Sequence, residues 1–291
     1  MKPPAFEYIA ATSVEEAVAA LVKSDGTGKL IAGGQSLMPM LNFRLADPAV
    51  LIDIGRIPGL EGISETEIGL EIGALTRHAS LETSPAVAQH FPVLAEAMTH
   101  VAHLAIRNRG TIGGSLSHAD PAAELPLMAV LLDAVLCIVG PEGSREVPAK
   151  EFFIGALTTD LEDEEMVTAV TLPYLSAGAG WGFEEVSRRS GDFALAAAAA
   201  TLKLDGGVVS DVRLAVTGVD DLPLRMREAE AALNGAALDD GAVAKAAHGV
   251  RDAINPNSDA QASADYRRHL IGVLTARVLR SAAARAEGGG P

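Results

Sequence analysis

The sequence has almost no cysteine, no excess of basic residues and no long apolar run. Its single cysteine, Cys137, allows no disulfide within the chain and cannot supply the four thiolates of an all-cysteine iron–sulfur cluster. The 23 Lys and Arg residues against 38 Asp and Glu residues give a formal net charge of −15, which repels nucleic acid and anionic membrane surfaces. No apolar run reaches the roughly 18 residues that a membrane-spanning helix requires. These absences exclude a nucleic-acid-binding protein, a membrane span and an internal iron–sulfur cluster.

Composition and the spacing of apolar residues indicate a globular chain with two domains. The 291 residues are 48% hydrophobic and 21% charged, and single cores stop growing at roughly 250 to 300 residues. Residues 173–180, which contain proline and several glycines, have the composition of a linker. We therefore expect one domain over residues 1–175, with subdomains of about 1–55 and 56–175, and a second domain over residues 181–287. The first residues lack the pattern of a signal peptide, so we expect a cytoplasmic location.

Local patterns predict several helices and strands along the chain. Residues 91–105 predict one helix, residues 131–139 a strand and residues 223–233 a helix. For the run 196–200, five alanines, intrinsic propensity favours a helix, but the flanking hairpin pattern favours a strand, and we predict a strand. The tail 288–291 is three glycines and a proline, and we expect it to be disordered.

Two short loops provide the main functional signal. Either pair of glycines also suits an ordinary tight turn, but adjacent glycines accept positive φ and turn their N–H groups to one side, which forms a nest for an anion. An acidic chain has to hold a phosphate through such backbone dipoles, and a hydroxyl such as that of Ser36 can cap the turn that follows. We predict that both loops hold one diphosphate from two sides. The first loop is Ala32, Gly33, Gly34, Gln35 and Ser36, and the second is Thr111, Ile112, Gly113, Gly114 and Ser115.

Other candidate sites are weaker. The chain contains no Gly-x-Gly-x-x-Gly fingerprint and no phosphate-binding-loop lysine motif, and no nucleophile supported by a base is visible, so we assign no catalytic residue. His100 and His103 have a metal-ligand spacing on the predicted helix, but no acidic or cysteine partner lies near them in sequence, and we assign no metal site. For Arg107 and Arg109 we expect a solvated or ion-paired structural role, with phosphate pairing as the alternative.

The motifs "AGGQS" and "TIGGS", followed by "ADPAAELP", resemble those of the FAD-binding medium subunits of molybdenum hydroxylases, the xanthine dehydrogenase and carbon monoxide dehydrogenase family. The resemblance extends over nearly the whole chain, and the two glycine loops together are its most specific part. It implies an α+β fold: a two-subdomain FAD-binding domain of the vanillyl-alcohol-oxidase/PCMH type, followed by a smaller C-terminal domain with an antiparallel sheet and helices.

The same resemblance implies a function and a cofactor. The chain would carry FAD, accept electrons from a small subunit with [2Fe–2S] clusters and pass them to an external acceptor, while a large subunit with a molybdenum–pterin site oxidises the substrate. The complex would be a dimer of heterotrimers. Both glycine loops would hold FAD, with Glu124 and Leu161 nearer its rings. Two residues depart from the family pattern: Ser115 stands where many relatives have Asn, and Glu184 stands where some relatives place a lysine near the flavin, so the acceptor and the potential cannot be carried over.

Two alternatives remain open at this stage. One is a self-sufficient FAD-dependent oxidase or reductase with the same kind of FAD domain, although the second domain is short for such an enzyme. The other is an assembly protein that has kept the fold without using flavin, against which the intact glycine loops argue.

Overall fold

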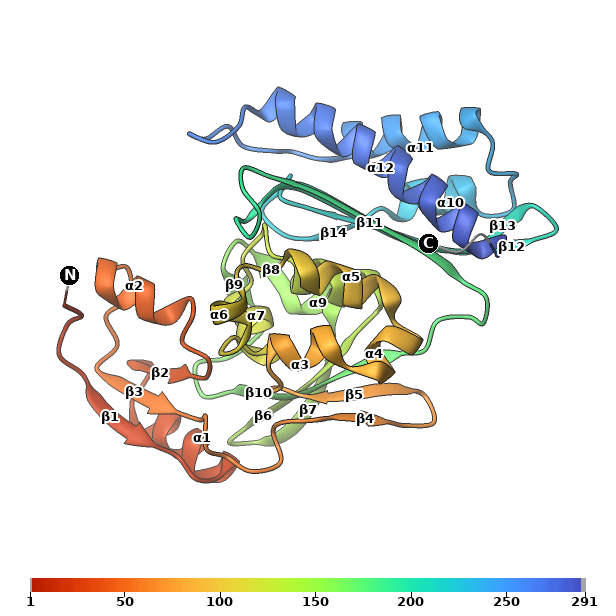
Figure 1. Ribbon diagram of the computed structural model, residues 1–291. Coiled ribbons are helices and arrows are strands. Elements are labelled where there is room, and N and C mark those ends of the chain that lie inside the picture. Colours follow the sequence, from red (N-terminus) through yellow and green to blue (C-terminus); the bar gives the residue numbers. More distant parts are fainter. Residues whose placement is uncertain (1, 289–291) are drawn as a thin grey trace.

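The computed structural model describes residues 2–288, which contain three larger sheets and one two-stranded sheet (Figure 1). The content is 37% helix and 28% strand, which confirms the α+β prediction. Residues 289–291 of the tail predicted to be disordered lie outside the described residues. Within the described part, no helix has both the length and the apolar character needed to span a bilayer.

The N-terminal sheet is a parallel βαβ unit with strand order β1-β3-β2. Its first helix begins after Ser13, whose hydroxyl accepts from the Glu16 N–H at 3.2 Å, while the Glu16 carboxylate accepts from the Thr12 N–H at 2.7 Å. Satisfying these free N–H groups fixes the start of the helix. The elements are β1 Glu7–Ala10, α1 Val14–Lys23, β2 Gly28–Ile31, α2 Leu37–Phe43 and β3 Val50–Asp53.

The middle sheet is antiparallel, with strand order β4-β5-β10-β6-β7. Helices cover the face of this sheet that points toward the C-terminal part, so they form a layer between two sheets (Figure 1). The strands are β4 Ile63–Glu65, β5 Gly69–Gly73, β6 Val135–Gly140, β7 Gly143–Pro148 and β10 Met166–Pro173, with a separate pair β8 Phe153–Gly155 and β9 Thr158–Thr159. The helices are α3 His78–Thr83, α4 Pro85–His90, α5 Pro92–His100, α6 Leu104–Arg107, α7 Ile112–His118, α8 Glu124–Leu131 and α9 Ala149–Phe152.

The single helix predicted over residues 91–105 is wrong, because the chain breaks between α5 and α6. Ala102 has φ +44°, which is outside the range of a right-handed helix. The Arg107 guanidinium donates to the carbonyls of Val101 and Ala102 at 2.9 Å each and so stabilises the turn. His100 therefore ends α5, and His103 lies just before α6. The predicted strand 131–139 also starts later than expected, at β6, because α8 continues through Leu131.

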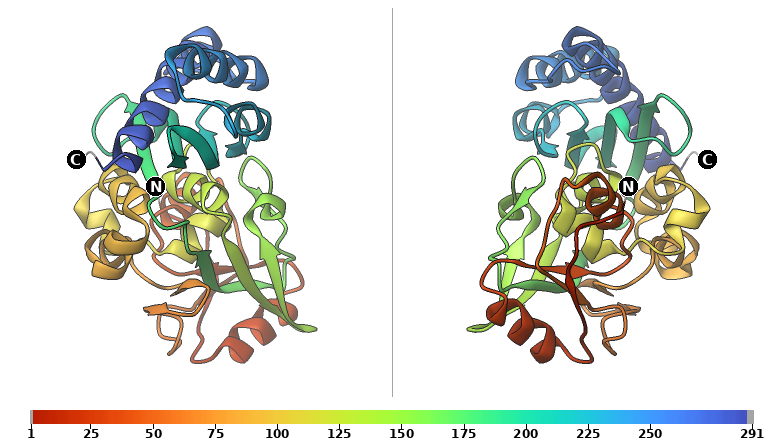
Figure 2. Two further views of the ribbon diagram at one scale, coloured as in Figure 1. Left: turned by 90° about the vertical axis from the view of Figure 1, so that its right-hand side faces the viewer. Right: turned by 90° about the vertical axis from the view of Figure 1, so that its left-hand side faces the viewer.

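The C-terminal sheet has the order β11-β12-β13-β14, with α12 packed against one face and the helical layer against the other (Figures 1 and 2). The predicted strand at the alanine run is confirmed: alternate alanines of β12 face α12 and α8, so small side chains let helices approach from both sides. The predicted helix 223–233 is preceded by a short strand and begins only at Arg227. The elements are β11 Gly180–Ser187, β12 Ala194–Asp205, β13 Val208–Thr217, β14 Leu224–Arg225, α10 Arg227–Leu233, α11 Asp240–Ala253 and α12 Ala264–Ala286.

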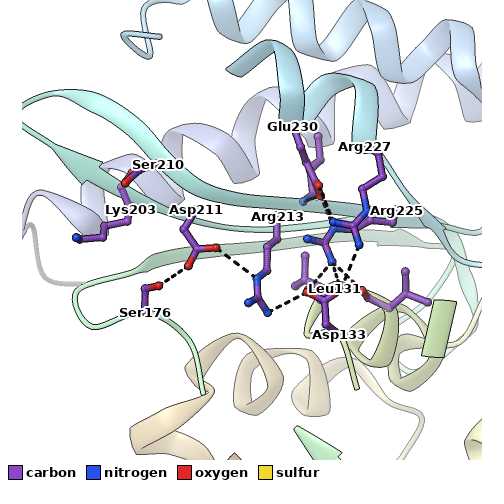
Figure 3. Close-up of polar contacts among 12 residues, drawn as sticks. Leu131, Asp133, Ser176, Lys203, Ser210, Asp211, Arg213, Arg225, Arg227 and Glu230 are labelled. Carbon is purple, nitrogen blue, oxygen red and sulfur yellow. Dashed lines mark hydrogen bonds and ion pairs between the residues drawn. The ribbon is translucent and has the colours of Figure 1, made fainter. Parts of the chain in front are cut away.

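A buried arginine ties the C-terminal sheet to the helical layer (Figure 3). Arg225 of β14, 8% exposed, donates to the carbonyls of Val130 and Leu131 at 3.1 and 3.2 Å, which caps the C-terminus of α8. It also pairs with Asp133 at 2.9 Å and with the buried Glu230. This positive group at the negative end of a helix fixes where α8 stops and how the sheet sits on it.

Candidate functional site

The first glycine loop connects β2 to α2 and offers free donors. Gly34 has φ +71°, whereas Gly33 has ordinary backbone angles, and Gln35 donates from Nε2 to the Gly33 carbonyl at 3.0 Å. Ser36 makes no side-chain capping bond, so the cap predicted for it is wrong. Among residues 2–288, no protein acceptor is found for the backbone N–H groups of residues 33–36. A row of free N–H groups is the chemistry that holds an anionic oxygen.

Gly33 is required because the two loops touch. A Cβ at Gly33 would overlap the Arg109 carbonyl and lie 2.9 Å from the Gly110 Cα, directly before the second loop. The structure therefore brings the first loop against the backbone of Arg109 and Gly110, directly before the second loop.

The second loop is not a nest, and that prediction is wrong. Thr111 is the N-cap of α7: its hydroxyl accepts from the Gly114 N–H at 3.1 Å, and neither Gly113 nor Gly114 has positive φ. The Gly113 N–H donates to the Ala74 carbonyl at 2.8 Å, and a Cβ on Gly113 would lie 2.6 Å from the Ala74 Cβ. Close packing, not a left-handed backbone, explains this glycine.

The first-turn N–H groups of α7 already have acceptors. Ile112 donates to the Thr76 carbonyl at 3.1 Å and Ser115 to the Thr111 carbonyl at 3.0 Å. The second loop thus presents its exposed Gly114 and the half-buried Ser115 hydroxyl beside the first loop, rather than a second row of free donors.

His78 supports the second loop, and the sequence analysis missed it. Its backbone N–H donates to the Gly110 carbonyl at 3.0 Å, and its ring Nε2 lies 3.0 Å from the Thr111 carbonyl. Because a carbonyl only accepts, Nε2 carries the proton. Burial lowers the pKa of His78 to about 4, so the ring is neutral at physiological pH. The neighbouring Arg77 side chain donates to the Arg109 carbonyl. A lone histidine at a helix start gives no sequence signal for such a role.

Arg107 has the ion-paired structural role expected for it, whereas the Arg109 side chain is exposed. The Arg107 Nε lies 2.8 Å from the Glu82 carboxylate, and both side chains are largely buried. His100 and His103 do not share a helix face, because His100 ends α5 and His103 is the N-cap of α6. No group of three or more His, Cys, Asp or Glu residues that could hold a metal ion occurs within the described residues.

Two carboxyl groups without a cationic partner meet where the helical layer contacts the C-terminal sheet. Glu124 begins α8 and is 5% exposed; burial, and then the charge of Asp120, raise its pKa to about 7. Glu185 of β11 is close enough that, after burial, the Glu124 charge contributes to raising its pKa to about 8. Its Oε2 is buried and has no hydrogen-bond partner. Near neutral pH, Glu124 is therefore partly protonated and Glu185 largely protonated.

Strand alternation separates Glu185 from Glu184. The Glu184 carboxylate lies 3.8 Å from Arg277 of α12, on the face away from the helical layer, whereas Phe183 packs into the core that β11 shares with that layer. Of the two neighbouring acids, Glu185 is therefore the one that faces the helical layer. Leu161 follows β9 and packs, partly buried, against the same core.

These residues fit a dinucleotide with a diphosphate. Four free N–H groups and a positive-φ glycine follow the end of β2, and neither loop contains an acidic side chain. Helix α7 packs against α8, which begins with Glu124, and against β9, which precedes Leu161. The predicted site residues therefore lie in neighbouring elements: the loop after β2, the start of α7, the start of α8 and the loop after β9.

The family comparisons cover both parts of the chain. A family model described as "FAD binding domain in molybdopterin dehydrogenase" matches residues 4–175, and one described as "CO dehydrogenase flavoprotein C-terminal domain" matches residues 181–282. The "6-hydroxypseudooxynicotine dehydrogenase complex subunit alpha" of Paenarthrobacter nicotinovorans is 43% identical over 287 residues, which are 98% of this chain and 97% of that protein. The "Carbon monoxide dehydrogenase medium chain" of Hydrogenophaga pseudoflava is 40% identical over 98% of this chain and 99% of that protein.

Solved structures agree with these matches. A structure of carbon monoxide dehydrogenase from Hydrogenophaga pseudoflava aligns with TM-score 0.96 at 43% identity, covering 98% of this chain and 99% of the other. Quinoline 2-oxidoreductase from Pseudomonas putida 86 aligns with TM-score 0.93 at 39% identity, covering 99% of each chain. The chain therefore belongs to the family of FAD-binding medium subunits of molybdenum hydroxylases.

Proposed function

We propose that this chain works inside a multi-subunit molybdenum hydroxylase, where it accepts electrons from a [2Fe–2S] subunit and passes them to an external acceptor. The observation that supports this most directly is the lack of any electron donor of its own: one cysteine cannot hold a cluster, and the described residues contain no metal-ligand group. Electrons for its cofactor then have to arrive across a protein interface.

We assign the diphosphate of FAD to the free N–H groups of residues 33–36. Bound FAD supplies a ring system that takes up electrons singly or in pairs. The chain's part is to bind and orient it: the first loop binds the anion, and the backbone of Arg109 and Gly110, which leads into α7, packs against that loop at Gly33. Ala32, Gln35, Ser36 and the 111–115 loop complete this assignment.

Glu124 and Leu161 are assigned to the ring end of the cofactor. A carboxyl with a pKa of about 7 is partly protonated at neutral pH, so Glu124 can donate a hydrogen bond as well as accept one. Leu161 offers an apolar surface that excludes water.

The domain division and the partners belong to the same proposal. The matches that end at residue 175 and begin at residue 181 support an FAD-binding domain over 1–175, with subdomains of about 1–55 and 56–175, and a C-terminal domain over 181–287. Relatives named as a medium chain and as a complex subunit support assembly with a [2Fe–2S] small subunit and a molybdenum–pterin large subunit, as a dimer of heterotrimers. Relatives are named for carbon monoxide, nicotine and glyceraldehyde, so no substrate is assigned. A cytoplasmic location stays a prediction.

Anaerobic stopped-flow spectroscopy tests the proposal. The FAD-loaded chain alone should show no loss of flavin absorbance when the substrate of the complex is added, and rapid loss should appear once both partner subunits are present. Rapid bleaching of the chain alone would instead support the self-sufficient oxidase or reductase. A colourless chain that still assembles with the partners would support the flavin-free assembly protein.

A further inference from the structure

A groove between α11 and α12 lies on the outer face of the C-terminal part, on the opposite side of the sheet from the helical layer (Figures 1 and 2). It has a volume of about 490 Å³ and is open to solvent along its length. Its walls combine basic or imidazole side chains with small apolar ones, and no carboxylate is among them. The lining residues are His248, Arg251, His269, Arg277 and Arg280, together with Ala244, Ala247, Gly272, Val273 and Ala276.

Residues 240–286, which include both walls of the groove, carry a net positive charge, whereas the whole chain is acidic. Residues 240–286 contain seven Lys and Arg side chains against four Asp, whereas the whole chain has 23 against 38 Asp and Glu. Arg280 pairs with Asp240 at 2.9 Å and Arg277 with Glu184 at 3.8 Å, and His248 lies 3.3 Å from the Asp252 carboxylate; the two arginines stay more than half exposed. A local basic surface on a strongly acidic protein is a mark of a binding surface for an acidic partner.

The exposed face of α12 has the spacing of a helix-packing seam. Tyr266, His269, Val273, Ala276 and Arg280 follow one another at alternating steps of three and four residues, the a and d pattern of paired helices. Tyr266, which lies beyond the lining residues of the groove, is 46% exposed and Val273 is 38% exposed, whereas Ala276 is partly buried against the core. The groove side of α11 repeats this spacing at Ala244, Ala247 and Arg251.

Gly272 shapes the floor of the groove. A glycine inside a helix costs roughly 1 kcal/mol relative to alanine, and here a Cβ would lie 2.5 Å from the Cδ of Arg251. The missing side chain lets the Arg251 stem lie across α12. Within residues 2–288 the Arg251 guanidinium has no ion-pair partner, so it is available to a ligand in the groove.

We propose that this groove docks an acidic amphipathic helix of a partner protein. Two helices with a shared a and d seam accept a third helix between them, and the stretch from Tyr266 to Arg280 is about 21 Å long, the length of a helix of roughly four turns. The basic walls select acidic side chains on that helix. Nucleic acid and anionic membranes are disfavoured as occupants, since the chain as a whole carries a formal net charge of −15. The proposal does not depend on where FAD binds.

Fluorescence anisotropy on the full chain tests the proposal. The probe is a labelled helical peptide of about 18 residues, with leucine at its a and d positions and glutamate on its exposed faces. The unmodified chain should bind it, more weakly as salt rises. R277E/R280E should weaken binding about tenfold, because two attractive contacts become repulsive, and V273E should weaken it through the apolar seam. K23E/K150E is the matched control: it makes the same change of net charge at exposed sites outside the groove, and it should bind as the unmodified chain does.

Three results would overturn the proposal. Equal binding of the peptide to the unmodified chain and to R277E/R280E would show that the peptide binds outside the groove. Equally tight binding of a peptide with the same composition in scrambled order, or of a DNA duplex, would show general attraction of polyanions. Self-association of the chain that R277E/R280E abolishes would show that a second copy fills the groove. Circular dichroism of each variant excludes loss of the helices as the cause.

Discussion

Replacing Glu185 by Gln should flatten the dependence of stability on pH. Glu185 faces Glu124 without a cationic partner, and burial, then the Glu124 charge, raise its pKa from 4.5 to about 8. Its pKa in the folded chain is above that of the unfolded chain, so its contribution to stability is fully present below pH 4.5. That contribution is lost as the pH rises toward about 8, because over this range the unfolded chain ionises and the folded chain does not.

The size of the effect follows from the shift. One pKa unit corresponds to about 1.4 kcal/mol, so a shift from 4.5 to about 8 is worth at most about 5 kcal/mol. Glu185 is only partly buried, and water that reaches its carboxyl lowers the expected loss between pH 5 and pH 8 to roughly 2 kcal/mol. Glu185→Gln keeps the size of the side chain and removes this ionisation. Glu124 is the titratable group that acts on it, Asp120 acts in turn on Glu124, and the His100 ring lies 5.0 Å from the Phe183 ring at a tilt of 58°; all of them remain in the variant.

Urea unfolding between pH 5 and pH 9, at one saturating FAD concentration, measures the difference. The unmodified chain should lose roughly 2 kcal/mol more than Glu185→Gln over this range. Glu184→Gln is the matched control, since Glu184 is the neighbouring acid on the opposite face of β11 and pairs with Arg277; it should follow the unmodified chain. Parallel curves for the unmodified chain and Glu185→Gln would refute the burial of a protonated carboxyl at this interface.

Two further changes test the loop contact and the ion-pair cluster. Gly33→Val should remove bound FAD, read from the ratio of flavin to protein absorbance, because its side chain overlaps the Arg109 carbonyl and separates the loops; full occupancy with intact circular dichroism would contradict the assignment. Asp133→Ala should lower the free energy of unfolding by about 1 to 2 kcal/mol, since Arg225 and two other arginines share this carboxylate. Asp163→Ala, which removes only an exposed pair with Lys29 at 4.0 Å, should change it by less than about 0.5 kcal/mol; equal losses would refute the role of Asp133.

Most strands and helices could be predicted from apolar spacing, caps and turns, but their ends depended on distant residues. Helix α8 extends to Leu131 because Arg225, 94 positions further on, caps its carbonyls. The break after His100 depends on Arg107, whose guanidinium binds the carbonyls of the turn. Neither arginine differs, in the sequence, from a solvated surface residue, so pattern alone cannot reveal that it ends a helix.

The faces of β11 show the same limit at the candidate site. No secondary structure was predicted for this stretch; in the structure it is a strand, and strand periodicity requires Glu184 and Glu185 to point to opposite faces. Which acid meets α8 depends on the side against which α12 packs. Gly180 and Gly182 settle this: a Cβ on either would overlap the backbone of α12 at Ala282 or Val278. Residues of even number on β11 therefore face α12, and Glu185 is left facing Glu124.

The two glycine loops look alike in sequence and differ in structure because glycine has two distinct uses. At Gly34 it permits positive φ, as the nest prediction required. At Gly33 and Gly113 it permits close approach, to the Arg109 carbonyl and to Ala74, and the backbone angles are ordinary. Only the second use creates the contact between the loops. The free N–H groups of the first loop are then held in place by a helix start whose own donors are already engaged, so one loop is equipped to bind an anion and the other to position it.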